Sequence, residues 1–237
     1  MVRIAAVGDI HFGADSRGLL EPHLERLTEC ADILLIAGDL TRRGDPEEAR
    51  LLAEELRPAR LPVVAVLGNH DYHLDRQDDV REILEGIGVT VLEGESTTMS
   101  LDGARIAIAG LKGFGGGFAG ACGTDFGEPE MKAFVRHTKS LAERLEEVVG
   151  GLKADLKVVL MHYAPIEATL LGERLEIYPF LGSYLLAEAV DAHGADLILH
   201  GHAHNGSEKG ATPGGIDVRN VAQSVIRHPY GLYTLGR

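Results

Sequence analysis

The sequence has 237 residues, of which 45% are hydrophobic and 25% charged, and a formal net charge of −13 at pH 7. This length and composition predict a globular protein, and we expect residues 1–237 to form one large domain with a sizeable core. The sequence contains no long apolar run and does not begin with a signal-peptide pattern, which argues against a membrane protein and favours the cytoplasm.

The cysteine content and the charge distribution narrow the range of partners. Cys30 and Cys122 lie in unlike contexts, so we expect free thiols rather than a disulfide framework or a zinc cluster. Lysine and arginine do not cluster, so we expect no long nucleic acid as a partner, and no basic amphipathic helix predicts membrane docking. A small anionic ligand stays compatible with the acidic chain, because bound divalent cations reverse the local field. The sequence leaves open whether identical chains form an oligomer.

In the first half of the chain, strand-like apolar runs alternate with helical patterns. Strands are predicted over residues 3–7, 32–37, 62–67 and 89–92, and helices over residues 19–30, 47–57 and 78–85. Asp45 is expected to cap the second of these helices, with Pro46 in its first turn. Such alternation is typical of a parallel sheet with helices on its outside.

The pattern changes in the second half. Asp102-Gly103 predicts a hairpin between strands 97–101 and 105–109. Further helices are expected over residues 130–149 and 182–193, and further strands over residues 156–161, 196–199, 216–222 and 231–235. Hairpins mixed with βα units indicate two sheets packed face to face with helices outside.

Polar side chains follow five of the predicted strands, at the point where each strand ends. They are Asp9 and His11, then Asp39, then Asn69, His70 and Asp71, then His162, and last His202 and His204. Because the carboxyl ends of parallel strands meet at one edge of a sheet, these side chains can converge on one site. Carboxylate, amide and imidazole ligands without thiolate suit Mn, Fe, Zn, Ni or Co rather than structural zinc.

These five blocks resemble, in order, the signature of the calcineurin-like metallophosphoesterases. The blocks are Asp9-Ile10-His11, Gly38-Asp39, Gly68-Asn69-His70-Asp71, His162 and Gly201-His202-Ala203-His204. The resemblance extends from Asp9 to His204 and covers most of the chain. It implies an α/β fold, a four-layer α/β/β/α sandwich with two mixed sheets.

The resemblance also implies two divalent metal ions per chain, of which Mn, Fe and Zn are the candidates. It assigns the first ion to Asp9, His11 and His204, and the second to Asn69, His162 and His202, with Asp39 bridging both. Two such ions clamp the reacting oxygens and lower the pKa of a bound water from about 16 toward about 7, which gives hydroxide as the nucleophile. We expect His70 to stabilise the phosphoryl oxygens or to protonate the leaving group, and Asp71 to orient the His70 imidazole.

The expected activity is therefore metal-dependent hydrolysis of a small phosphate ester, with a phosphodiester of the cyclic-nucleotide type preferred. The segment Gly38-Asp39-Leu40-Thr41-Arg42-Arg43-Gly44 departs from the Gly-Asp-x-x-Asp-Arg-Gly block of the family's protein phosphatases, which argues against that branch. A phosphomonoesterase, a pyrophosphohydrolase and a non-catalytic scaffold on the same fold are the alternatives.

Two further segments are candidates for the rim of the site. The glycine-rich residues 113–127 either close over a ligand or form a surface excursion, and residues 163–180 leave directly from His162. Within the second segment, Arg174 either holds a phosphate or is solvated, and Tyr178 and Phe180 either stack on a base or pack on the sheet. His200 is expected at most to support the ligands.

Overall fold

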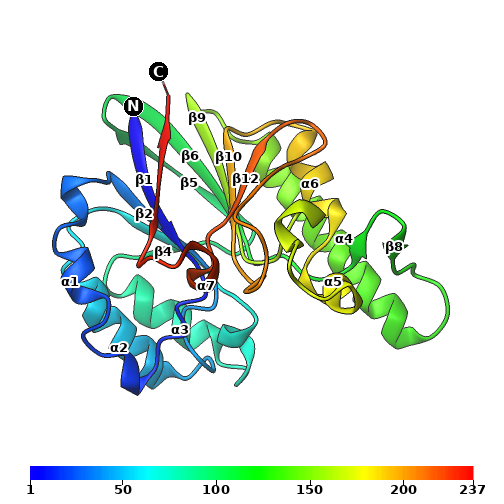
Figure 1. The fold of residues 1–237 in the computed structure, drawn as a ribbon, viewed down its shortest axis with the longest axis horizontal. Coiled ribbons are helices and arrows are strands. Elements are labelled where there is room, and N and C mark those ends of the chain that lie inside the picture. The colour runs from blue at the N-terminus through cyan, green and yellow to red at the C-terminus, as the bar shows by residue number, and fades with distance from the viewer. Residues whose placement is uncertain (237) are drawn as a thin grey trace.

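The structure, a computed structural model, describes residues 1–236 and consists of two large β-sheets packed face to face (Figure 1). The first sheet has the strand order β13 (Gly231–Leu235), β1 (Val2–Val7), β2 (Ile33–Ala37), β3 (Val63–Val66) and β4 (Thr90–Val91). Strands β1 to β4 are parallel, and β13 pairs antiparallel with β1, which places Val2 opposite Leu235 and brings the two ends of the chain together.

The second sheet is also mixed. Its strand order is β11 (Lys209–Ala211), β12 (Asp217–Asn220), β10 (Leu197–His200), β9 (Leu156–Met161), β6 (Ala104–Leu111) and β5 (Glu95–Leu101). The four inner strands are parallel, whereas β11 and β5 are antiparallel edges. Asp102 and Gly103 both have positive φ, at 46° and 79°, and form the tight turn between β5 and β6 that the sequence predicts.

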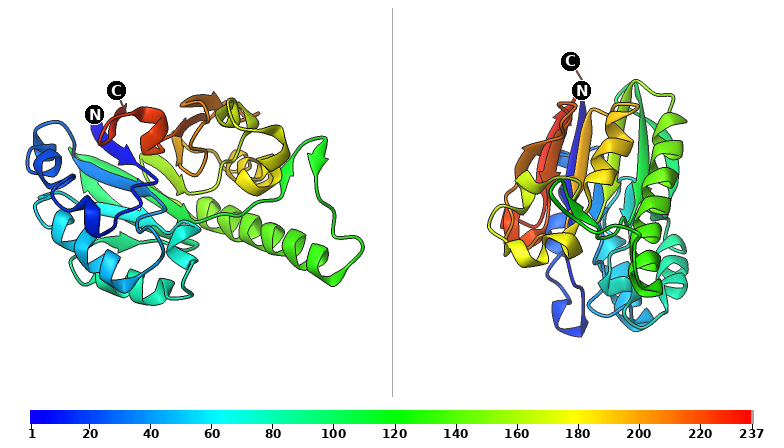
Figure 2. Two further views of the ribbon diagram at one scale, coloured as in Figure 1. Left: turned by 60° about the horizontal axis from the view of Figure 1, so that its bottom comes forward. Right: turned by 90° about the vertical axis from the view of Figure 1, so that its right-hand side faces the viewer.

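Helices cover the outer face of each sheet. The helices are α1 (Glu21–Leu24), α2 (Pro46–Leu56), α3 (Gln77–Glu85), α4 (Pro129–Gly150), α5 (Tyr178–Leu181), α6 (Tyr184–Asp191) and α7 (Gln223–Ile226). Short 3-10 turns span Ala14–Ser16, Leu27–Glu29, His70–Tyr72, Glu167–Leu170 and Leu175–Ile177. Helices α1 to α3 lie against the first sheet, and α4 and α6 lie against the second (Figure 2). Among residues 1–236, no helix combines the length and apolar character that crossing a bilayer requires.

Alternating side chains form three large apolar cores between the layers, and a fourth, smaller cluster contains Phe118 and Tyr178. In β1, Ala5 and Val7 face the helices, whereas Ile4 and Ala6 face the other sheet. In β6, Ile106 faces the first sheet and lies in the core between the sheets. Three cores between four layers confirm the predicted α/β/β/α sandwich with two mixed sheets.

The local predictions hold with one clear exception. Asp45 caps α2, and its side chain accepts a hydrogen bond from the Glu47 N–H at 2.9 Å. The single helix predicted over residues 19–30 is wrong, because α1 ends at Leu24 and a separate 3-10 turn follows at Leu27–Glu29. The break falls at Arg26, whose φ of −102° and ψ of 4° leave the helical region, and Leu27 is fully buried after it.

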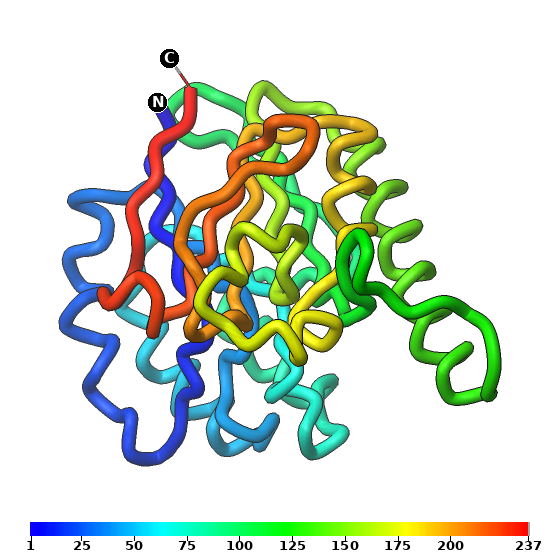
Figure 3. Tube along the Cα trace, turned by 45° about the vertical axis from the view of Figure 1, so that its right-hand side comes forward, coloured from blue at the N-terminus to red at the C-terminus, as the bar shows by residue number. Residues whose placement is uncertain are grey.

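The glycine-rich segment projects from the sandwich and carries a small hairpin of its own. Strands β7 (Gly117–Phe118) and β8 (Ala121–Cys122) pair antiparallel, and the chain then loops out before α4 (Figure 3). The Phe118 side chain is buried at the base of this hairpin, whereas Phe126, further along, is 86% exposed. The segment is therefore anchored at its start and solvated at its tip.

Candidate metal centre

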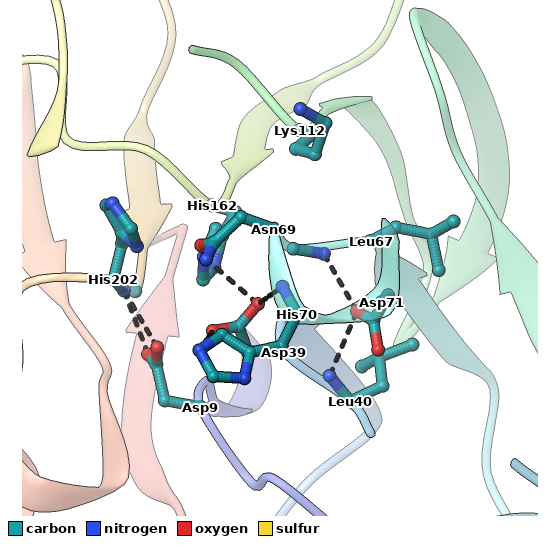
Figure 4. A network of polar contacts seen from close by, with 12 residues as sticks. Asp9, Asp39, Leu40, Leu67, Asn69, His70, Asp71, Lys112, His162 and His202 are labelled. Carbon is teal, nitrogen blue, oxygen red and sulfur yellow. Dashed lines mark hydrogen bonds and ion pairs between the residues drawn. The ribbon is translucent and has the colours of Figure 1, made fainter. Parts of the chain in front are cut away.

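The predicted ligands converge where the carboxyl ends of both sheets meet. They follow β1, β2 and β3 of the first sheet and β9 and β10 of the second. Figure 4 shows five of them, Asp9, Asp39, Asn69, His162 and His202. Four of these positions have positive φ, an uncommon conformation for residues other than glycine: Asp9 at 58°, His11 at 46°, Asp39 at 48° and His202 at 69°. This backbone geometry points the side chains into a common space and is not visible in the sequence.

The first group of candidate ligands contains Asp9, His11, Asp39 and His204, whose donor atoms all lie within 4.8 Å of one another. His204 Nε2 lies 2.9 Å from Asp9 Oδ1, and His11 Nε2 lies 3.5 Å from His204 Nε2. His11 Nε2 also lies 3.6 Å from Asp39 Oδ2. Two carboxylates and two imidazoles at this spacing can hold one cation.

The second group contains Asp39, His162 and His202, again with donor atoms within 4.8 Å of one another. His162 Nε2 lies 3.3 Å from Asp39 Oδ1 and 2.9 Å from Asn69 Oδ1, so Asn69 adds an amide oxygen to this group. Asp39 is common to both groups and directs Oδ2 toward His11 and Oδ1 toward His162.

Burial and charge make both groups suitable for divalent cations. Asp9 and Asp39 are buried, and within residues 1–236 their ion-pair partners are histidines alone. Burial opposes ionisation of Asp9, but the hydrogen bond with His204 and nearby imidazoles hold its pKa below the ordinary value. Burying carboxylates without lysine or arginine is costly unless cations compensate. Carboxylate, imidazole and amide donors fit Mn, Fe or Zn.

The surroundings of His202 and His162 suit metal binding, whereas the hydrogen bond with Asp9 raises the pKa of His204. Burial lowers the pKa of His202 to about 3, so its imidazole is uncharged, which is the form that binds metals. His162 Nδ1 lies 2.9 Å from the Ala37 carbonyl oxygen and donates to it, which leaves the Nε2 lone pair facing Asp39 and Asn69.

Gly68 allows the third strand end to approach the bridging carboxylate. A Cβ atom added at Gly68 would lie 2.1 Å from Asp39 Oδ1 and 2.2 Å from the Asp39 nitrogen, and no real side chain tolerates such contacts. With this close approach, the backbone N–H of His70 donates a hydrogen bond to Asp39 Oδ1 at 2.9 Å. The glycine before Asn69 is therefore a packing requirement of the centre.

His70 lies at the mouth of the centre and is 44% exposed. Its Nδ1 lies 2.8 Å from the carbonyl oxygen of Arg42, and its Nε2 lies 4.0 Å from Asp39 Oδ2. The His70 ring packs edge-on against the His11 ring, with centroids 4.5 Å apart. The Arg42 carbonyl thus fixes the ring so that Nε2 faces the space between the ligands and solvent.

The prediction that Asp71 orients the His70 imidazole is wrong. The Asp71 carboxylate is fully buried and accepts hydrogen bonds from the N–H groups of Leu40, Thr41 and Gly68 and from the Thr41 hydroxyl, at 2.6–3.1 Å. Burial, followed by the charge of Asp39, raises the pKa of Asp71 to about 6. Asp71 therefore joins the segments that follow β2 and β3 instead of contacting the His70 ring.

Replacing Asp71 with alanine is expected to lower the free energy of unfolding by about 3 kcal/mol or more, because three buried N–H groups and one hydroxyl lose their acceptor. Urea denaturation followed by circular dichroism measures this loss. Asp71→Asn keeps one acceptor oxygen, so its loss should be smaller. Unfolding free energies of Asp71→Ala and wild type within 1 kcal/mol of each other would show that the carboxylate has no such role.

The residues predicted at the rim of the site lie in different environments. Tyr178 is buried and donates its hydroxyl to the Leu170 carbonyl at 3.0 Å, so packing rather than base stacking accounts for it. Phe180 is 62% exposed, and its carbonyl oxygen lies 3.2 Å from His202 Nε2, so residues 163–180 do reach the centre. Arg174 is exposed. His200 is fully buried between Thr169 and the Gly201 carbonyl.

The sequence analysis missed Lys112, which follows β6 directly. Its Nζ lies 4.7 Å from the ring centroid of Tyr72, 5.3 Å from that of Phe114 and 5.4 Å from that of Tyr163. Burial lowers the pKa of Lys112. The rule that polar residues at strand ends form the site would have identified Lys112, because β6 pairs parallel with β9, which leads into His162.

The chain belongs to the calcineurin-like phosphoesterase family, whose sequence model matches residues 2–206. This family is typically dependent on two metal ions, in agreement with the two candidate ligand groups. The match includes every predicted ligand block, and it confirms the resemblance seen in the sequence.

Two proteins are similar in sequence to this chain, and a solved structure shares its fold. Uncharacterized protein YpbG of Bacillus subtilis (strain 168) is 26% identical over 202 residues, which cover 84% of this chain and 60% of YpbG. Protein F40B5.2 of Caenorhabditis elegans is 22% identical over 233 residues, which cover 97% of this chain and 41% of that protein. The chain thus spans less than two thirds of either relative. Phosphopantetheinyl hydrolase (PptH) from Mycobacterium tuberculosis shares the fold, with a TM-score of 0.68, 18% identity, and coverage of 94% and 90% of the two chains.

Proposed function

We propose that this protein is a dinuclear-metal phosphoesterase that hydrolyses a small phosphodiester. The observation that carries the proposal is the position of Asp39, whose two carboxylate oxygens face two separate groups of candidate ligands. In this proposal Asp39 would be a ligand shared by two divalent ions of Mn, Fe or Zn. Asp9, His11 and His204 would hold the first ion, and Asn69, His162 and His202 would hold the second.

Different residues of this chain have different roles in the proposed reaction. When bound, the two ions supply an activated water nucleophile and neutralise charge on the phosphoryl oxygens. His162 is oriented by the Ala37 carbonyl and offers its Nε2 lone pair to the centre. His70 is held by the Arg42 carbonyl, which leaves Nε2 available at the mouth of the centre, and in this proposal it protonates the leaving-group oxygen.

The charge around the centre favours a diester over a monoester. A phosphomonoester carries a charge of about −1.5 to −2 at pH 7. A phosphodiester has one fewer ionisable oxygen, so its phosphoryl group carries a charge of about −1. Arg42 is exposed and pairs with Asp15 at 2.7 Å, so its charge is already engaged. Lys112 lies further away, beyond Asn69 and His162 (Figure 4). A singly charged phosphoryl group suits this limited cationic supply.

Two further observations bear on the location and the natural substrate. Cys30 and Cys122 are free thiols, and Cys122 is exposed, which favours a reducing cytoplasm. The named fold relative is a phosphopantetheinyl hydrolase, so phosphopantetheinyl esters belong in a substrate screen beside cyclic nucleotides.

The test compares hydrolysis of bis-p-nitrophenyl phosphate and p-nitrophenyl phosphate by the protein reconstituted with Mn²⁺. We expect faster hydrolysis of the diester, and loss of that activity on chelation. His193→Ala is the control variant, because His193 contacts Glu146 on the α4–α6 side rather than the centre. Faster hydrolysis of the monoester would make the protein a phosphomonoesterase. No hydrolysis of either ester by protein carrying two metal ions would contradict the proposal.

A further inference from the structure

Lys112 is held beside the candidate metal centre by backbone hydrogen bonds. Its carbonyl oxygen accepts the N–H groups of His162 and Tyr163, both at 3.0 Å. Figure 4 shows Lys112 beyond Asn69 and His162, on the side of the centre that lies away from Asp9. A substrate that reaches from the centre to Lys112 would therefore extend past Asn69 and His162.

The ammonium group of Lys112 is half-buried among aromatic rings and has few polar partners. Its hydrogen-bond partner within residues 1–236 is the Gly113 carbonyl oxygen, at a long 3.5 Å. The rings of Tyr72, Phe114 and Tyr163 surround it, the nearest centroid being 4.7 Å from Nζ. Hydrogen-bond donors of this ammonium therefore stay available for a ligand.

The carboxylate of Glu93 has other partners. It accepts the Leu67 N–H at 3.1 Å and the Tyr72 hydroxyl at 2.9 Å. These bonds fix the Tyr72 ring beneath Lys112. On the other side, the Tyr163 ring packs 4.3 Å from the His202 ring, centroid to centroid. The Tyr163 ring therefore contacts both the surroundings of Lys112 and the His202 side of the centre.

We propose that Lys112, with the rings of Tyr72 and Tyr163, forms a subsite that binds a second phosphate group of the substrate. The inference rests on the proposed function and specifies its substrate class: small phosphodiesters that carry a further phosphate beyond the scissile one. Within residues 1–236 no carboxylate pairs directly with this half-buried ammonium, and the charges of Glu93 and Asp39 act on it from further away, so it gains a charge-assisted hydrogen bond when that phosphate binds. The rings pack against the part of the substrate that joins the two phosphates.

The experiment compares two chromogenic esters that differ in one phosphate. Thymidine 5′-(p-nitrophenyl phosphate) and its 3′-phosphorylated form release the same leaving group. For the wild-type protein we expect kcat/KM about tenfold higher for the 3′-phosphorylated ester. In Lys112→Met this ratio should fall below about twofold, and Lys112→Arg should restore most of it. Lys153→Met is the matched control, because Lys153 is exposed before β9, at the opposite end of the sheet.

Equal ratios in wild type and Lys112→Met would overturn the subsite, and so would a wild-type ratio of one. Binding measured by calorimetry separates this result from a failure of the proposed function. Adenosine 3′,5′-bisphosphate should bind wild type about tenfold more tightly than adenosine 5′-monophosphate, and this preference should disappear in Lys112→Met. If neither ester is hydrolysed, the proposed function fails, and the two nucleotides alone decide the subsite: equal affinities would overturn it.

Discussion

Asp39→Asn is expected to bind fewer than two metal ions per chain and to lower kcat/KM for bis-p-nitrophenyl phosphate about 10³-fold or more. Both oxygens of Asp39 face candidate ligands, Oδ2 toward His11 and Oδ1 toward His162. An asparagine offers one neutral oxygen and an NH₂ group that cannot coordinate a cation. A 10³-fold loss corresponds to about 4 kcal/mol of transition-state stabilisation.

Metal content by mass spectrometry and steady-state rates measure this effect on the same preparations. Asp217→Asn serves as the control, since Asp217 is exposed and pairs with Arg219 on β12. The control should keep the wild-type metal content and rate. If Asp39→Asn retains two ions and more than a tenth of the wild-type rate, Asp39 does not bridge them.

His70→Ala is expected to lower kcat about 10²–10⁴-fold for a diester with an alkoxide leaving group, such as a cyclic nucleotide. The loss should be much smaller for bis-p-nitrophenyl phosphate, because p-nitrophenolate departs without being protonated. His70 Nδ1 is bonded to the Arg42 carbonyl, so Nε2 is the atom available to a leaving-group oxygen. Metal content should stay unchanged, since His70 belongs to neither ligand group.

His73→Ala is the matched control for this variant, because His73 is exposed and three residues further along the chain. It should hydrolyse both substrates at the wild-type rate. An equal loss for both substrates in His70→Ala would instead assign the imidazole to the phosphoryl oxygens. Wild-type rates for both would show that His70 takes no part in the reaction.

The sequence predicted the ligand positions because their arrangement depends on one simple property of the fold. Parallel strands end at the same edge of a sheet. Polar residues that follow β1, β2, β3, β9 and β10 therefore come together regardless of the conformation of the connecting segments. Asp9 and His204 are 195 residues apart in the chain and nevertheless lie 2.9 Å apart. The apolar periodicity that predicts single strands and helices is equally local, whereas the four-layer sandwich was implied by the family resemblance.

The sequence did not predict the partners of residues whose environment depends on tertiary contacts. The partners of Asp71 are N–H groups of the neighbouring strand end, and no spacing in the sequence shows which loop lies beside it. For Tyr178 the sequence left packing and base stacking open, and the outcome depends on how residues 163–180 fold back to bring its hydroxyl to the Leu170 carbonyl. Lys112 lies outside the family signature, so its position beside His162 emerged from the pairing of β6 with β9.

The most direct test of the dinuclear centre is titration of metal-free protein with Mn²⁺, followed by calorimetry and electron paramagnetic resonance. A carboxylate that bridges two ions about 3.5–4 Å apart makes them magnetically coupled. We predict two Mn²⁺ ions bound per chain, with a coupled spectrum at two equivalents that is absent in Asp39→Asn. A single Mn²⁺ per chain, or two ions with the spectrum of isolated Mn²⁺, would contradict the shared role of Asp39.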